Sequence, residues 1–218
     1  MQEKIYPILD IDYLTKNNTS YKEILDIWNK NSDLISFFQL RAKNLSFYQY
    51  KKLYKKIKEL TNLQIIINDN WKLALEEKIF GIHLGKEDWL NLKISEQKKI
   101  KELKLDYKGT SSHSLSDLFN LDKKVWNYTG FGPIYSTLNK KSDYPVLGIK
   151  NLKKAIKLNL IHLVPIGGIN LSKYKKIIKL GILTPAMIGE VNDKKKLVKL
   201  LDFIRLNSRL NPSNEESR

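Results

Sequence analysis

Short apolar segments of the kind that form β-strands alternate with amphipathic helical patterns along the whole of this 218-residue chain. The expected strands are Ile5–Ile11, Leu34–Leu40, Leu63–Asn68, Gly81–Leu84, Leu105–Thr110, Val125–Phe131, His162–Ile166 and Ala186–Gly189. Apolar residues recur at helical spacing from Phe47 to Leu60, and again from Leu197 to Ile204. Such alternation is typical of βαβ units, in which parallel strands are covered by helices on both faces.

The number of these units predicts how the sheet closes. Eight strand–helix units in about 200 residues is the number found in a closed (β/α)8 barrel, the TIM barrel. We therefore predict an α/β protein with a single domain, the barrel, over residues 1–210. An open, doubly wound parallel sheet is the main alternative, because it is built from the same units. Residues 211–218 are polar and lack periodicity, which predicts a flexible polar tail.

The composition narrows the chemistry and the partners. The chain contains no cysteine, which excludes disulfides, cysteine-ligated zinc and thiol catalysis. Its 39 Lys and Arg against 23 Asp and Glu give a net charge of +16, which suits an anionic partner, either nucleic acid or phosphorylated metabolites. The lysines are spread over the helical segments and do not gather in one patch. We therefore interpret the charge mainly as the solvated faces of outer helices.

The hydropathy pattern bears on location. No apolar run approaches the roughly 18 residues of a membrane span, and residues 1–4 carry no apolar signal segment. We therefore expect a cytoplasmic protein with no membrane partner. The sequence leaves the oligomeric state open, a homo-oligomer included.

The second expected strand runs into Gln39-Leu40-Arg41-Ala42-Lys43. Side chains alternate along a strand with a period of two, so Gln39, Arg41 and Lys43 point to one side. A guanidinium and an ammonium group directed together suit a diphosphate, because arginine offers a two-pronged donor and lysine a point charge. The alternative is that Arg41 and Lys43 only begin a surface loop.

Two carboxylates follow the ends of the third and fourth strands. Asp69 comes directly after Asn68, and Asp88 lies shortly beyond the next strand. Because neighbouring strands of a barrel end at the same mouth, these carboxylates can face a common point, and together with phosphate oxygens and water they would satisfy Mg²⁺. The alternatives are a helix N-cap for Asp69 and an exposed turn for Asp88. We expect His83 to pack or hydrogen-bond within its strand and not to bind metal.

The fifth strand runs into Gly109-Thr110-Ser111-Ser112-His113-Ser114. Small hydroxyl side chains at a strand end let a ligand approach closely, and they can hydrogen-bond phosphate or ring nitrogens. One of these serines is expected to cap the helix that starts near Leu115. His113 could carry a proton near neutral pH, but a structural or lining role is the interpretation we favour.

The last three strands end in glycine-containing turns. The sixth is followed by a polar loop, residues 130–141, which ends in two lysines. The seventh is followed by Gly167-Gly168 and the eighth by Ile188-Gly189, each ahead of a helix. Backbone N–H groups at such turns can face an anion, and barrels often build a phosphate site from the loops after strands seven and eight. We therefore predict a phosphate site here.

Taken in order, these motifs resemble the thiamine-phosphate synthase family. The shared series is Gln-x-Arg-x-Lys, Asn-Asp, His-Leu-Gly-x-x-Asp, Gly-x-Ser, Gly-Pro-Ile-Tyr-x-Thr-x-x-Lys and Gly-Gly-Ile, with one motif at each strand end, between about Ile5 and Val191. The resemblance implies a transferase of thiamine biosynthesis with Mg²⁺ as cofactor. Its partners would be two small phosphorylated substrates: hydroxymethylpyrimidine diphosphate would lose pyrophosphate, and the nitrogen of hydroxyethylthiazole phosphate would take its place, giving thiamine phosphate.

The same resemblance assigns roles to individual residues. The pyrimidine diphosphate would be held by Gln39, Arg41, Lys43, Asn68, Ser111 and Lys140. Mg²⁺ would be bound by Asp69 and Asp88, which are the expected metal ligands. The thiazole phosphate would be held by Thr137 and Asn139 and by the backbone amides of Gly168, Ile188 and Gly189. Arg41, Lys43 and Lys140 would be catalytic, because they place positive charge where the departing pyrophosphate develops negative charge.

The chain departs from the family pattern at several positions. Lys86 stands where Gln is common, Asn127 where Asp is common and Ser136 where Pro is usual. Asn139 and Gly189 replace a Thr and a Ser at the expected thiazole-phosphate site. Asn139 keeps a side-chain donor and Gly189 keeps its backbone N–H, so we expect altered contacts there without loss of the reaction.

Two other functions stay open at this point. One is the related thiazole tautomerase, a barrel that uses a histidine near the position of His113. Its sequences generally lack the Asn-Asp and Gly-x-x-Asp pair that this chain contains. The other is a non-catalytic, basic protein that binds nucleic acid, which would gather basic and aromatic residues on one face. The motifs at the strand ends argue against it, so we expect no nucleic-acid partner.

Overall fold

The computed structural model describes residues 5–137, 144–182 and 184–210, with side chains up to residue 207. Its eight strands are β1 (Tyr6–Asp10), β2 (Phe37–Arg41), β3 (Gln64–Asn68), β4 (Gly81–Leu84), β5 (Tyr107–Ser112), β6 (Tyr128–Phe131), β7 (His162–Pro165) and β8 (Ala186–Met187). Two of the expected site residues, Asn139 and Lys140, lie outside the described residues, as does the predicted tail, residues 211–218.

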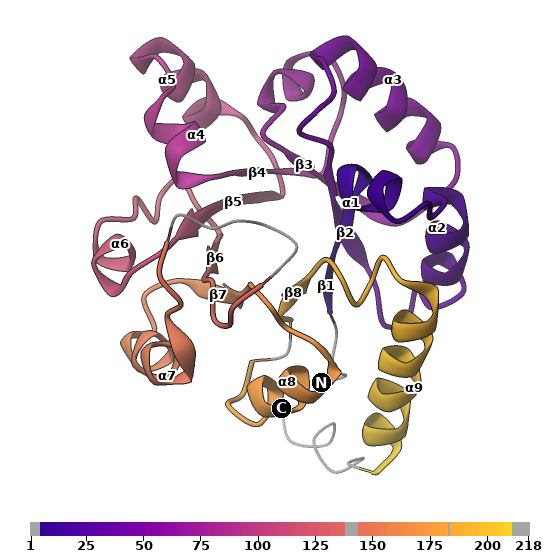
Figure 1. The fold of residues 1–218 in the computed structure, drawn as a ribbon. Coiled ribbons are helices and arrows are strands. Elements are labelled where there is room, and N and C mark those ends of the chain that lie inside the picture. Colours follow the sequence, from indigo (N-terminus) through magenta and orange to yellow (C-terminus); the bar gives the residue numbers. More distant parts are fainter. Residues whose placement is uncertain (1–4, 138–143, 183, 211–218) are drawn as a thin grey trace.

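The strands form one parallel sheet that curves into a nearly closed barrel (Figure 1). Their order is β7-β6-β5-β4-β3-β2-β1-β8, so each strand pairs with its neighbour in sequence and β8 returns to the side of β1. This confirms the predicted (β/α)8 barrel and excludes the doubly wound sheet. All eight expected strands are present, with bounds that differ from the expected ones by a few residues.

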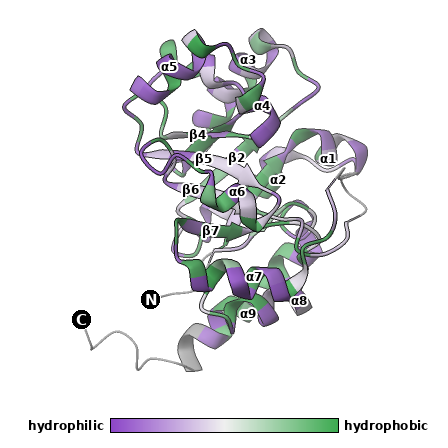
Figure 2. Ribbon diagram, turned by 90° about the vertical axis from the view of Figure 1, so that its left-hand side faces the viewer, coloured by the Kyte–Doolittle hydropathy of each residue, from purple (hydrophilic) through white to green (hydrophobic). Residues whose placement is uncertain are grey.

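The helices surround the strands (Figure 1). They are α1 (Ile11–Lys16), α2 (Tyr21–Asn29), α3 (Phe47–Lys58), α4 (Lys86–Leu90), α5 (Ile94–Glu102), α6 (Leu115–Phe119), α7 (Gly148–Leu158), α8 (Leu171–Ile178) and α9 (Lys194–Leu210), with a 3₁₀ helix, η1 (Trp71–Leu75). Hydrophilic and hydrophobic residues alternate along the outer helices, as amphipathic helices require (Figure 2). In the described ranges, no helix is long and apolar enough to cross a membrane.

The core has two layers, because successive side chains of a strand face opposite sides of the sheet. On β2, Phe38 and Leu40 pack into the outer layer between the strands and the helices. The inner layer fills the barrel itself with the buried side chains Tyr6, Ile8, Ile66, Tyr128, Val164 and Ala186. Polar residues of the same strands, such as Gln39, therefore point into the barrel, where a ligand could meet them.

Aromatic rings fill much of the barrel interior. The rings of Tyr107 and Tyr128 stack with centroids 4.7 Å apart, and Tyr6 lies 5.6 Å from Tyr128. Gly109 makes room for this packing, since a Cβ at that position would lie 2.0 Å from Cζ of Tyr128. The aromatic layer therefore depends on a glycine in the neighbouring strand.

A buried asparagine ties the short last strand to the first. The side-chain amide of Asn192 donates to the carbonyl oxygens of Ile8 at 2.7 Å and Ile188 at 2.8 Å. Because β8 contains only two residues, its backbone pairing with β1 is short, and these hydrogen bonds reinforce it. They also fix the loop after β8, which contributes to the candidate site.

Candidate active site

Two adjoining cavities open at the carboxyl ends of the strands. The smaller, about 230 Å³, is lined by the residues expected to hold a diphosphate and a metal ion: Gln39, Arg41, Lys43, Asn68, Asp69, Asp88 and Ser111. The larger, about 340 Å³, is lined by the described residues expected at the second phosphate: Thr137, Gly168, Ile188 and Gly189. Ser111, His113 and Ile188 line both cavities, so ligands in the two would lie side by side.

The alternation predicted for the end of the second strand is present. Gln39 is buried on the inner side, and its side-chain amide donates to the hydroxyl of Tyr6 at 3.1 Å. Arg41 and Lys43 also line the smaller cavity, whereas Leu40 and Ala42 pack into the outer core. Both residues thus line a cavity at the mouth of the barrel, with Arg41 at the end of β2 and Lys43 beyond the strand with its side chain 43% exposed.

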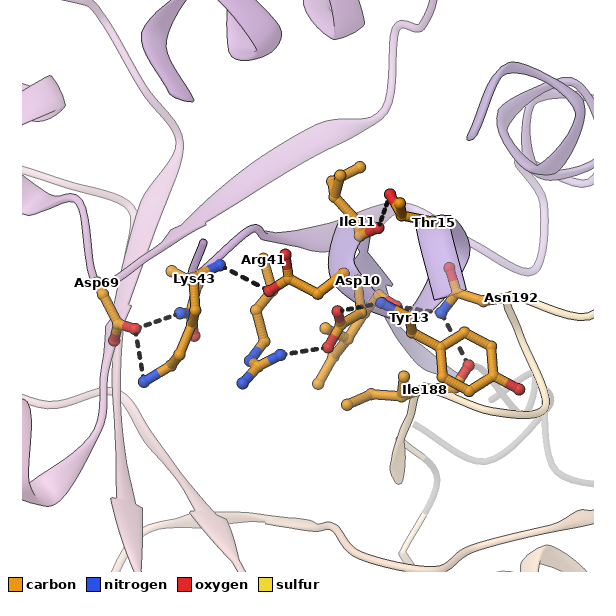
Figure 3. Close-up of polar contacts among 12 residues, drawn as sticks. Asp10, Ile11, Tyr13, Thr15, Arg41, Lys43, Asp69, Ile188 and Asn192 are labelled. Carbon is orange, nitrogen blue, oxygen red and sulfur yellow. Dashed lines mark hydrogen bonds and ion pairs between the residues drawn. The ribbon is translucent and has the colours of Figure 1, made fainter. Parts of the chain in front are cut away.

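Asp10, at the end of β1, contacts a residue of the candidate site and was not predicted from the sequence. One of its carboxylate oxygens pairs with the guanidinium of Arg41 (Figure 3). The other accepts the backbone N–H of Tyr13 at 3.0 Å and so caps α1. The side chains of Arg41 and Asp10 are only 17% and 5% exposed, so solvent screens this pair less than it screens a surface salt bridge. The strand-end rule, applied to the first strand as well, would have found it.

Lys43 lies between the two expected metal ligands. Its ammonium nitrogen is 3.1 Å from a carboxylate oxygen of Asp69 and 3.6 Å from one of Asp88. The side-chain amide of Asn68 donates to the same oxygen of Asp69 at 2.6 Å. Asp69 does not cap η1, since the residue at that cap is Asn70. The two carboxylates therefore face a common point, as predicted, and Lys43 occupies it here.

Asp88 has a perturbed acidity. It lies in the first turn of α4 and so belongs to a helix and not to the turn considered as an alternative, and its side chain is 43% exposed. Partial burial raises its pKa, the charge of Asp69 raises it further, and Lys43 opposes both. The backbone at Gly85 leaves space for this carboxylate, because a Cβ there would lie 2.6 Å from an Asp88 oxygen.

The protein supplies only part of a metal's ligand set. Across the described ranges, no group of three or more His, Asp or Glu side chains is arranged to hold a metal ion. Two carboxylates alone are a fit for Mg²⁺, which usually keeps several waters and takes substrate phosphate oxygens as its other ligands.

A chain of hydrogen bonds crosses the barrel interior beneath the smaller cavity. The Tyr6 hydroxyl, which accepts from Gln39, lies 2.5 Å from the hydroxyl of Tyr128. Nδ1 of His83 is 3.1 Å from the Tyr128 hydroxyl, and its Nε2 is 3.1 Å from the hydroxyl of Ser111. This confirms that His83 hydrogen-bonds within the barrel. Gln39 and Ser111, both expected to hold the pyrimidine diphosphate, are thus the two ends of one network.

The tyrosines in this network stay neutral. Complete burial raises the pKa of Tyr6 and of Tyr128 well above the ordinary value. Both hydroxyls therefore remain protonated at neutral pH and act as hydrogen-bond relays. Sequence reasoning missed them because they lie at the amino ends of β1 and β6, and polar residues were sought at the carboxyl ends.

The larger cavity is lined by rigid turns. Gly168 has φ +60, and a Cβ there would lie 2.2 Å from the carbonyl oxygen of Ser136. Nδ1 of His113 lies 2.6 Å from the carbonyl oxygen of Gly132, and its ring stacks on Tyr144 at 3.8 Å. The His113 ring is therefore held in place at the point where the two cavities meet. Ser114 caps α6, as expected for one of the serines here.

Comparison with known proteins adds independent evidence. The sequence profile of the family described as thiamine monophosphate synthase matches residues 5–191. The chain is 28% identical to the thiamine-phosphate synthase of Clostridium acetobutylicum over 213 residues, which cover 94% of this chain and 96% of that protein. It is 31% identical to thiamine-phosphate synthase 1 of Aquifex aeolicus over 150 residues, 67% of each protein.

A solved structure agrees with these sequence relatives. The thiamine phosphate pyrophosphorylase from Pyrococcus furiosus superposes with a TM-score of 0.72 and 25% identity, covering 92% of this chain and 96% of that one. The profile match extends over every strand and every lining residue of the smaller cavity, from Ile5 to Val191. The chain belongs to the thiamine monophosphate synthase family.

Proposed function

We propose that this chain joins hydroxymethylpyrimidine diphosphate to hydroxyethylthiazole phosphate, forming thiamine phosphate and releasing pyrophosphate. The observation that carries the proposal is the pair of adjoining cavities at one mouth of the barrel. One contains cationic side chains and two carboxylates, which suit a diphosphate with its metal ion. The other is bounded by glycine turns ahead of a helix, which suit a phosphate monoester. Membership of the family supports the same assignment.

The pyrimidine diphosphate would bind in the smaller cavity. Gln39 and Ser111, fixed by the buried network, would contact the pyrimidine ring. Arg41, oriented by Asp10, would direct its other N–H donors at the diphosphate. The C–O bond to the pyrophosphate would break ahead of attack, so the site must chiefly stabilise negative charge on the leaving group. One preorganised donor in such a position is commonly worth about 3 kcal/mol of activation free energy.

Asp69 and Asp88 would hold Mg²⁺, and the bound ion would neutralise charge on the leaving pyrophosphate. Lys43 lies within ion-pair distance of both carboxylates. With the ion in place, Lys43 would be free to contact phosphate oxygens. It could then both bind the diphosphate and stabilise the charge of the leaving group, the two roles expected for it. Lys140 would add a further positive charge; it lies outside the described residues.

The thiazole phosphate would bind in the larger cavity, held by the backbone amides of Gly168, Ile188 and Gly189 and by Thr137. Its ring nitrogen would then face the pyrimidine across the shared residues Ser111, His113 and Ile188. No side chain is needed as a general base, because the attacking nitrogen carries no proton. A cytoplasmic location and the absence of nucleic-acid and membrane partners remain predictions of the same proposal.

The test is a reaction of the purified protein with both substrates and Mg²⁺, with products identified by mass spectrometry. The proposal predicts thiamine phosphate only when all three are present. Conversion of a thiazole phosphate tautomer in the absence of the pyrimidine substrate, without thiamine phosphate in the complete mixture, would favour the tautomerase instead.

A further inference from the structure

A carboxylate of the chain itself lies where the second phosphate is expected. Glu190 follows β8 and lines the larger cavity. Its side-chain oxygen accepts the backbone N–H of Leu171, the first residue of α8, at 3.2 Å. The N–H groups of a first helical turn are the usual donors to a bound anion. Glu190 therefore uses one of the donors that a phosphate would use.

A second donor of the same turn is also taken. The side-chain oxygen of Asn170, the N-cap of α8, accepts the backbone N–H of Lys173 at 3.1 Å and the hydroxyl of Ser172 at 2.9 Å. Two backbone N–H groups at the start of α8 are thus already hydrogen-bonded, one to a neutral acceptor and one to a charged acceptor. Of these, only Glu190 adds negative charge.

The contacts recorded for the neighbouring lysines Lys173 and Lys196 are with other groups. Among the described residues, Glu190 forms no salt bridge. The ammonium group of Lys173 donates to the carbonyl oxygen of Gly168 at 2.8 Å and lies over the ring of Tyr135. Lys196 lies 3.5 Å from a carboxylate oxygen of Asp193. Glu190 instead contacts the positive end of α8, which is the same end that a phosphate needs.

We propose that the carboxylate of Glu190 competes with a bound phosphate for the N–H donors at the start of α8. It thereby sets how tightly the chain binds a phosphorylated second substrate relative to the unphosphorylated alcohol. The inference rests on the proposed function for the identity of that substrate, but not for the competition itself. A phosphate dianion must displace the carboxylate or bind beside it, and either route costs binding free energy. The corresponding alcohol, which carries no charge, escapes this cost.

The decisive variant is Glu190→Gln, which keeps a carbonyl acceptor for Leu171 and removes the charge. Because the variant removes a negative charge beside the bound anion, we expect inorganic phosphate to bind about tenfold more tightly, which corresponds to about 1.4 kcal/mol. Titration followed through the amide NMR signals of Gly168 and Leu171 reports on this cavity and not on the diphosphate site. Glu102→Gln, on α5 and outside both cavities, is the matched control for the change in net charge.

Two further measurements separate the possible failures. Glu190→Ala removes the acceptor for the Leu171 N–H as well as the charge. If Glu190→Gln does not fold, a gain in phosphate affinity in Glu190→Ala supports the proposal equally. With turnover, the ratio of KM for the thiazole phosphate to KM for its alcohol should fall about tenfold in Glu190→Gln. Phosphate affinity equal in wild type, Glu190→Gln and Glu102→Gln would overturn the inference. The titration needs no turnover, so an inactive protein would count against the proposed function alone.

Discussion

Replacing Tyr128 by Phe tests whether the buried hydrogen-bond chain stabilises the barrel and fixes its ligand contacts. The substitution keeps the ring that stacks on Tyr107 and removes only the hydroxyl, which lies 2.5 Å from that of Tyr6 and 3.1 Å from Nδ1 of His83. Each buried hydrogen bond contributes about 1 kcal/mol net, so the free energy of unfolding should fall by about 2 kcal/mol. For a domain of this size, that is a loss of about 4–8 °C in Tm.

The measurement is urea denaturation at constant m-value, with Tyr107→Phe as the control. Tyr107 belongs to the same aromatic cluster, but its hydroxyl takes no part in this chain of hydrogen bonds. We expect the control to change stability by less than about 0.5 kcal/mol. The KM for the pyrimidine diphosphate should also rise in Tyr128→Phe, because His83 then holds Ser111 less firmly. Equal stability of the two variants would refute the reasoning.

Three other changes test separate parts of the site. Asp88→Asn should abolish Mg²⁺-dependent turnover without lowering the stability of the ligand-free protein, because the raised pKa of Asp88 means that ionising this carboxyl group costs more free energy in the folded than in the unfolded chain. For the same reason, when the pH is lowered, the wild type should begin to lose Mg²⁺ affinity at a higher pH than a site whose aspartate has the ordinary pKa. Mg²⁺ titrations at several pH values check this. Activity that does not respond to EDTA would contradict the metal assignment. Arg41→Ala should raise the KM for the pyrimidine diphosphate and lower kcat by about 10²-fold. Ala42→Ser, on the outer side of the sheet, should change both much less. Equal effects of the two variants in steady-state assays would contradict the orientation of the strand end. Gly168→Ala should cost more than about 2 kcal/mol in urea unfolding, because a Cβ 2.2 Å from the Ser136 carbonyl oxygen cannot be accommodated without a backbone shift; wild-type stability would show that the turn is adaptable.

The hydrophobic pattern was sufficient to predict the barrel and the mouth at which polar residues gather. Alternation along residues 39–43 also predicted which side chains face inward, because the period of a strand leaves no other choice. Strand limits were less certain: Leu34 and Ile35 are apolar and fully buried, yet they precede β2 and pack against the helices. Burial alone does not distinguish a strand from the loop that enters it.

Contacts between distant residues could not be predicted in the same way. Tyr6 and Tyr128 are 122 positions apart, and their hydrogen bond follows from the packing of rings inside the closed barrel. The contact between Glu190 and the start of α8 depends on how two loops approach each other after the last two strands. Neither has a local signature in one sequence. The pair of Asp10 and Arg41 is different, since both lie at the ends of neighbouring strands in register.

We propose that the two cavities couple departure of pyrophosphate to formation of the bond to the thiazole. The most direct test is the initial rate of each product in one reaction that contains both substrates, Mg²⁺ and the purified protein. Thiamine phosphate and pyrophosphate should appear at equal rates, and both should stop when the thiazole phosphate is omitted. Pyrophosphate release that continues without thiamine phosphate would make the protein a hydrolase of the diphosphate and contradict the account.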